Sequence, residues 1–210
     1  KLVEISDPDL IEYSGFNSRE ILTPPHIAFV KISEGCNYSC SFCRIPRIRG
    51  KQQSRLIVDI VSEVRNLAAN GVVEIMVVSQ NTSDFGRDTG ENLLQLVTEL
   101  SKVDGIIWIR LLYLYPGIIK TEDFLKIMST DKIVPYLDMP IQHASPNLLR
   151  AMNRPFDINK TKKLFHDLRN MNPAITLRTT ILLGFPGEEE SDIELTADLM
   201  NEIRFDHLGT

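Results

Sequence analysis

Short apolar runs alternate with longer helical patterns along most of this chain, and this alternation limits its fold more than any other feature. The runs are rich in β-forming residues, while the stretches between them have the periodicity of amphipathic helices. We expect strands at 26–33, 74–79, 107–113, 135–141, 176–184 and 205–209, and helices near 57–70, 91–102, 121–129, 146–152, 157–171 and 188–203. This order predicts parallel strands with helical crossovers, and so an open α/β sheet or a partial (β/α) barrel.

Two of the expected helices carry end signals. Gly71 follows the first helix, where a glycine is favoured as a C-cap, and Asp192 lies with the acids of residues 188–190 at the start of the last one. Acidic side chains are favoured in a first turn by the helix dipole.

A polar motif follows each of the first five expected strands. In chain order the motifs are "EGCNYSCSFC", "SQNTSDFG", "LYP", "QHAS" and "GFPGE". Parallel α/β sheets and barrels place their chemistry at the carboxyl ends of the strands. We therefore expect these five motifs to meet at one edge of the fold and to form a functional site there.

All three cysteines of the chain, Cys36, Cys40 and Cys43, lie in the first of these motifs, with the spacing Cys-x3-Cys-x2-Cys. An odd number of closely spaced thiols is a poor disulfide framework, which favours a reducing, cytoplasmic location. Structural zinc normally takes four ligands, and a [4Fe-4S] cluster ordinarily takes four thiolates, so three would leave one iron open. A zinc-stabilised, non-catalytic domain remains the alternative interpretation.

The bulk composition excludes several other classes of protein. The 210 residues are 43% hydrophobic and 24% charged, the balance of an ordinary globular domain. Arg110 interrupts the longest apolar run, so no membrane span is expected, and the beginning of the chain lacks the pattern of a signal peptide. The formal net charge of -5 argues against general binding of nucleic acid.

The cysteine spacing resembles that of the radical S-adenosylmethionine (radical SAM) enzymes, whose core is a partial (β/α)6 TIM-like barrel. The resemblance implies that Cys36, Cys40 and Cys43 ligate a [4Fe-4S] cluster and that S-adenosylmethionine chelates its open iron and is cleaved to a 5'-deoxyadenosyl radical. Phe42 matches the aromatic residue that packs by the adenine in this family.

Further cofactor contacts are expected at the ends of the later strands. "ILLGFPGE", with Gly184, resembles the family's motif along the adenine pocket, and Arg178 could reach the cofactor's carboxylate or form a structural ion pair. Gln80 or Asn81 stands where the family often has a glycine-glycine-glutamate motif, and Gln142 is a candidate ligand contact. The turn with Gly184, Arg178 and the pair Gln80 and Asn81 each have an equally simple structural interpretation, whereas Gln142 is the better candidate among the polar residues after the fourth strand.

Two more polar residues follow the fourth expected strand. Asp138 lies within an apolar run, so we expect it to have a partner if it is buried. His143 could carry protons, but a hydrogen-bonded structural role fits it better.

A basic run follows the cysteines without an intervening acid. Its members are Arg44, Arg47, Arg49, Lys51 and Arg55. Such a run is usually a solvated face, and beside a cluster it could also hold the cofactor's carboxylate or an anionic macromolecule such as RNA.

Four longer stretches, which are "VKISEGCNYSCSFCRIPRIRGKQQSR", "VSQNTSDFG", "YLDMPIQHASPNLLRAMNRP" and "LRTTILLGFPGE", are together similar to the methylthiotransferases. "YLDMPIQHAS" with "AMNRP" is closer to the branch that modifies the β-carbon of an aspartate in small ribosomal subunit protein twelve than to the branch that modifies isopentenyladenosine in tRNA. That ribosomal protein is the implied substrate, tRNA the alternative one, and a protein such as flavodoxin the implied electron donor.

The resemblance also predicts the domain organisation. We expect residues 1–25 to be a lead-in from an N-terminal domain that carries a second [4Fe-4S] cluster. Residues 26–210 are expected to be the radical SAM core, truncated before a C-terminal RNA-binding-like (TRAM) domain.

Overall fold

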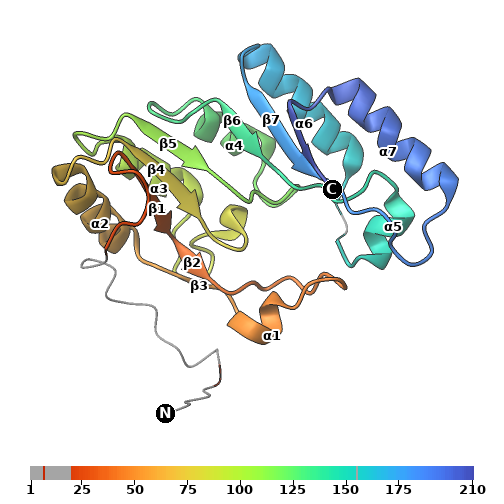
Figure 1. The fold of residues 1–210 in the computed structure, drawn as a ribbon, viewed down its shortest axis with the longest axis horizontal. Helices are drawn as coiled ribbons and strands as arrows, with labels where there is room; N and C mark the ends of the chain where they lie inside the picture. The colour runs from red at the N-terminus through yellow and green to blue at the C-terminus, as the bar shows by residue number, and fades with distance from the viewer. Residues whose placement is uncertain (1–6, 8–19, 155) are drawn as a thin grey trace.

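Six short parallel strands follow one another through the molecule in chain order (Figure 1). The computed structural model describes Asp7, residues 20–154 and residues 156–210. The strands are β1 (Ile27–Lys31), β4 (Glu74–Val78), β5 (Trp108–Leu111), β6 (Tyr136–Asp138), β7 (Thr176–Thr180) and β8 (His207–Gly209), with a small antiparallel pair of β2 (Ser33–Glu34) and β3 (Gln53–Ser54). The helices are α1 (Ile45–Arg49), α2 (Ile57–Ala69), α3 (Leu93–Ser101), α4 (Thr121–Met128), α5 (Pro146–Ala151), α6 (Ile158–Met171) and α7 (Glu190–Ile203), with a short 3-10 helix η3 (Thr82–Asp84).

The parallel strands form two three-stranded sheets, β1-β4-β5 and β6-β7-β8. A bridge between Ile109 and Ile133 links the sheets, and the Leu114 N–H donates to the Asp138 carbonyl oxygen at 2.9 Å. The spatial order of the strands is therefore also their chain order. Within the described residues no ladder joins β8 back to β1, so the structure is an open, partial barrel of the predicted α/β type.

Helices cover the sheets because each buries one apolar stripe. In α2 the stripe consists of Ile60, Val64 and Leu67, at the spacing of one helix face, and α2 packs on β1 while α3 packs on β5. In Figure 1, α6 and α7 lie next to each other beside β7. This arrangement leaves the carboxyl ends of the strands free for the connecting loops.

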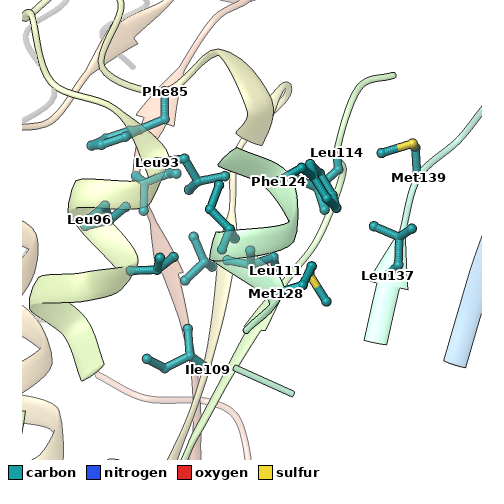
Figure 2. Packing of buried hydrophobic residues seen from close by; sticks show 14 of the residues in the cluster. Phe85, Leu93, Leu96, Ile109, Leu111, Leu114, Phe124, Met128, Leu137 and Met139 are labelled. Carbon is teal, nitrogen blue, oxygen red and sulfur yellow. The ribbon is translucent and has the colours of Figure 1, made fainter. Parts of the chain in front are cut away.

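One hydrophobic core connects the two sheets (Figure 2). Phe124 and Met128 of α4 pack near Leu111 of β5, and the same cluster continues to Leu137 of β6 and to Met139. Because the apolar residues of both halves belong to one cluster, the loops at the strand ends are held on a common support.

The structure follows the predicted elements closely. The helix predicted at 57–70 is α2 (Ile57–Ala69), which has Gly71 just beyond its C-cap with a φ of 91°, and Asp192 forms a capping box with Glu189 at the start of α7. The β2–β3 pair and α1 were not predicted, because two-residue strands and a five-residue helix leave no periodicity to detect.

The remaining expectations concern the beginning of the chain and membranes. Residues 1–6 and 8–19 of the predicted lead-in at 1–25 lie outside the described residues. In the part of the chain that is described, no helix has the length and apolar character needed to cross a membrane.

Candidate functional site

The cysteine loop, residues 36–43, begins directly after β2 at the carboxyl ends of the strands. Gly35 makes its entry possible, because Gly35 has a φ of 76° and a Cβ atom there would lie 2.2 Å from the Lys51 carbonyl oxygen. The Cys36 N–H donates to the Gly50 carbonyl oxygen at 3.2 Å. The antiparallel β2–β3 pair therefore fixes both the entry of the loop and its return.

The three thiols lie on the same loop but differ in burial. Cys40 is buried, whereas Cys36 and Cys43 are half-buried, and none of them is in a disulfide. Burial raises the pKa of the Cys36 thiol. A hydrogen bond from the Tyr38 backbone N–H lowers this pKa, whereas negative charge on Cys40 and Cys43 raises it.

Backbone N–H groups point at two of these sulfur atoms. Tyr38 provides one to Cys36, and the Ile45 N–H donates to Cys43 Sγ at 3.5 Å. Among the described residues, no group of three His, Cys, Asp or Glu side chains is arranged to hold a single metal ion.

The far side of the cysteine loop is docked on the end of α5. The Ser41 N–H donates to the Met152 carbonyl oxygen at 3.0 Å, and Asn153 Nδ2 donates to the Ser39 carbonyl oxygen at 2.9 Å. Ser41 Oγ also donates to the Ala151 carbonyl oxygen at 3.1 Å. Segment 151–154 therefore holds in place a loop more than a hundred residues earlier in the chain.

Arg154 and Tyr115 form the wall behind Cys40. The guanidinium carbon of Arg154 lies 3.9 Å from the centre of the Tyr115 ring, and Tyr38 stacks on the same ring with a centroid distance of 4.7 Å. Tyr115 therefore contacts both Arg154 and Tyr38 through its ring. Burial raises the pKa of Tyr115 to about 12, so its hydroxyl is neutral near pH 7.

A buried carboxylate, Glu34, precedes the cysteine loop. It pairs with Lys31 and accepts a hydrogen bond from Gln80 Nε2, while Arg49 Nε lies 3.9 Å away. The Gln80 side chain therefore contacts protein, and its Oε1 is buried without a partner among the described residues. Both polar atoms of the neighbouring Asn81 side chain are also buried and have no hydrogen-bond partner among the described residues.

Asp138 and Arg178 form an ion pair between β6 and β7. Arg178 Nη1 donates to Asp138 Oδ1 at 2.7 Å, and the Tyr113 N–H donates to Asp138 Oδ2 at 3.2 Å. The hydrogen bond to Asp138 raises the pKa of Arg178. The expectation that Asp138 is partnered is confirmed, and the structural interpretation of Arg178 is the one that its contacts favour.

The contacts of His143 favour the hydrogen-bonded structural role over the proton-carrying one. It is fully buried, its Nε2 lies 2.9 Å from Glu188 Oε1, and its Nδ1 accepts the Ser145 N–H at 2.9 Å. The same Glu188 accepts the Gly184 N–H at 2.6 Å through Oε2. The loop "GFPGE" is thereby tied to the end of β6.

Two other candidates lie at the same edge without side-chain contacts that define a role. Gln142 bridges to Ile181 through its backbone and has a φ of 72°, which is uncommon for a residue other than glycine. Phe42 is 39% exposed beside the half-buried Cys43.

The basic run divides into two groups in the structure. Arg44, Arg47, Arg49 and Lys51 are exposed on and around α1. Arg55 is buried instead, and its Nη1 lies 2.6 Å from Glu63 Oε2 of α2. Arg55 therefore stabilises the fold and does not belong to a solvated basic face.

The comparison with protein families identifies this chain as a member of a known one. A family model described as "Radical SAM superfamily" matches residues 30–200, which include all three cysteines and five of the six parallel strand ends. The chain belongs to the radical SAM superfamily.

Relatives of this radical SAM chain include two named ribosomal protein uS12 methylthiotransferase RimO. The protein of Caldanaerobacter subterraneus is 40% identical over the whole chain and 48% of the relative's length. The protein of Syntrophomonas wolfei is 45% identical over 94% of the chain and 46% of its own length. The chain spans about half the length of the curated relatives it matches.

A solved structure shares the radical SAM fold at low sequence identity. The radical S-adenosylmethionine methyltransferase TsrM from Kitasatospora setae aligns with a TM-score of 0.73 at 18% identity, covering 91% of this chain and 39% of that one. At this identity the likeness supports the fold alone.

Sequence reasoning did not single out Tyr115 or Arg154, although their motifs "LYP" and "AMNRP" were noted. Their positions in the sequence could have indicated them, since Tyr115 follows β5 and Arg154 follows α5. What the sequence does not show is that both side chains converge on Cys40, because that contact depends on the docking of segments far apart in the chain.

Proposed function

We propose that this chain is the radical-generating domain of a methylthiotransferase. Cys36, Cys40 and Cys43 would hold a [4Fe-4S] cluster, and S-adenosylmethionine would bind its open iron. The observation that carries this proposal is the placement of all three thiols on one loop at the carboxyl ends of six parallel strands, the edge where such folds bind ligands.

The groups around the sulfur atoms suit an iron-sulfur cluster. Thiolates bound to iron are stabilised by N–H donors, and the N–H groups of Tyr38 and Ile45 point at two of the sulfur atoms. The third thiol, that of Cys40, has the guanidinium of Arg154 next to it. The donor set therefore fits an anionic cluster.

When bound, the cluster and S-adenosylmethionine supply a radical that abstracts hydrogen from an unactivated carbon. The chain's own residues position these groups and exclude water. Asn81 and Gln80 offer buried polar atoms without a partner near the loop, whereas Arg178 is already paired with Asp138. Phe42, Gln142 and Gly184 remain candidate contacts because they lie at the same edge.

The proposed substrate is an aspartate of ribosomal protein uS12. Its support is the identity of 40–45% to proteins named for modification of uS12, together with the stretches "YLDMPIQHAS" and "AMNRP". A second cluster in the full-length protein would supply the sulfur, and a small electron-transfer protein such as flavodoxin would supply the electron.

The full-length protein tests this proposal when it is offered both substrates under reducing, anaerobic conditions with S-adenosylmethionine. We expect a methylthio group on uS12, detected by mass spectrometry, and none on tRNA. Thiomethylation of isopentenyladenosine in tRNA, with uS12 unchanged, would assign the protein to the other branch. Absence of 5'-deoxyadenosine in both assays would overturn the radical mechanism.

A further inference from the structure

Arg154 is a buried cation for which the described residues provide no acidic partner. Arg154 is only 7% exposed, and its Nε has no hydrogen-bond partner among the described residues. Burying an unpaired guanidinium is costly. A site of this kind is expected to contain a compensating negative charge.

The contacts of Arg154 point to where that charge belongs. Nη2 donates to the Pro140 carbonyl oxygen at the end of β6, the guanidinium stacks on Tyr115 at 3.9 Å, and Nη1 lies 4.0 Å from Cys40 Sγ. The guanidinium thus connects three separate strand-end segments. Of these neighbours, Cys40 is the one that would become a fixed thiolate when it ligates a metal cluster.

We propose that Arg154 is a positioning residue for the iron-sulfur cluster, an inference that rests on the proposed function. Its planar fork fixes Cys40 against the end of β6 and against Tyr115. Its charge also makes the cluster easier to reduce, because a nearby fixed cation in a partly dry site favours the more negative redox state.

These two effects can be separated by substitution. Arg154→Met removes the charge and the fork with little change in volume, whereas Arg154→Lys keeps the charge and loses the fork. Arg150→Met is the matched control, because Arg150 is exposed, lies four residues earlier, and its side chain hydrogen-bonds only to Asn147 among the described residues.

The measurements use the full-length protein after anaerobic reconstitution. For Arg154→Met we expect the ratio of reduced to oxidised cluster at a fixed potential to fall about tenfold, which is a midpoint lower by about 59 mV in a titration followed by electron paramagnetic resonance. For Arg154→Lys we expect a midpoint near that of the wild type but a several-fold faster loss of iron to a chelator. Arg150→Met should match the wild type in both.

Three results would overturn the proposal. They are a cluster in Arg154→Met with the wild-type midpoint, a midpoint in Arg154→Lys that falls as far as in Arg154→Met, and chelation rates that no variant changes. If Arg154→Met does not fold, Tyr115→Leu replaces it, with faster iron loss expected at an unchanged midpoint. A wild-type protein that binds no cluster would refute the proposed function itself, which distinguishes that failure from the failure of this inference.

Discussion

The strand ends beside the cysteine loop differ from the strand ends of the β6-β7-β8 sheet in how their buried polar groups are satisfied. At the ends of β2 and β4, buried polar atoms of Ser33, Gln80 and Asn81 have no partner among the described residues. At the ends of β6 and β7, Asp138 and His143 are equally buried, yet each has at least two hydrogen-bond partners within the chain.

This difference separates the β6–β7 end, whose buried polar groups bond to one another within the chain, from the β2–β4 end, whose buried polar groups can still accept a ligand. Buried polar groups without partners are rare in native proteins, and a bound water, ion or ligand can complete their hydrogen bonds. The β6–β7 end is therefore a rigid support, and the β2–β4 end with the cysteine loop is the part that a cofactor would complete.

We expect the free energy of unfolding to fall more when a buried polar side chain is removed from the β6–β7 support than when one is removed from the cysteine side. His143→Ala removes a fully buried ring and leaves Glu188 and Ser145 without their partner, so we expect a loss of about 3 kcal/mol in the free energy of unfolding. Urea denaturation measures it. His166→Ala is the control, because the His166 ring is half exposed, and it should cost less than about 0.5 kcal/mol. An equal loss of stability in the two variants would contradict a structural role for His143.

Backbone geometry provides a second comparison of the two regions. Gly35→Ala forces a Cβ against the Lys51 carbonyl oxygen, and we expect a loss of about 2–3 kcal/mol. Gly184 has almost the same φ of 75° but no atom within 4 Å of a Cβ, so Gly184→Ala should cost only about 1 kcal/mol. The urea midpoints of the two variants test this prediction. A lower midpoint for Gly184→Ala than for Gly35→Ala would contradict it.

The opposite behaviour is expected for the polar groups of the cysteine side. Asn81→Ala removes two unpartnered atoms, so the free energy of unfolding should change by less than about 1 kcal/mol. The same change should weaken S-adenosylmethionine binding to the reconstituted protein about tenfold, or about 1.4 kcal/mol, as measured by calorimetry. Asn66→Ala, on the exposed side of α2, is the matched control. A large loss of stability without any change in binding would make Asn81 part of the support.

The smallest effect is expected on the surface of the support. Hydrogen bonds from Lys162 and His166 lower the pKa of Glu202 below its ordinary value of 4.5. Glu202 therefore stabilises the fold above that value, and the contribution disappears as the pH falls through the folded-state pKa. Because the Glu202 side chain is exposed, Glu202→Gln should cost at most about 0.5 kcal/mol at pH 7. A cost that persists at pH 2 would contradict this.

The sequence was a good guide to the support and a partial one to the site. Strands and helices came within a few residues of their observed bounds because apolar periodicity is local, as in α6, predicted at 157–171 and found at Ile158–Met171. The cysteines and the edge to which they belong followed from spacing and strand order. The docking of Ser41 on Met152 and of Arg154 on Tyr115 did not, because such contacts join distant segments and have no local pattern.

Anaerobic reconstitution of this chain with iron and sulfide tests the central claim most directly. We expect about four irons per chain and a brown absorption that dithionite bleaches, with both lost in Cys36→Ala, Cys40→Ala and Cys43→Ala. One zinc per chain with no visible absorption, or a cluster that survives all three substitutions, would contradict the assignment of the cysteine loop as the radical-generating site.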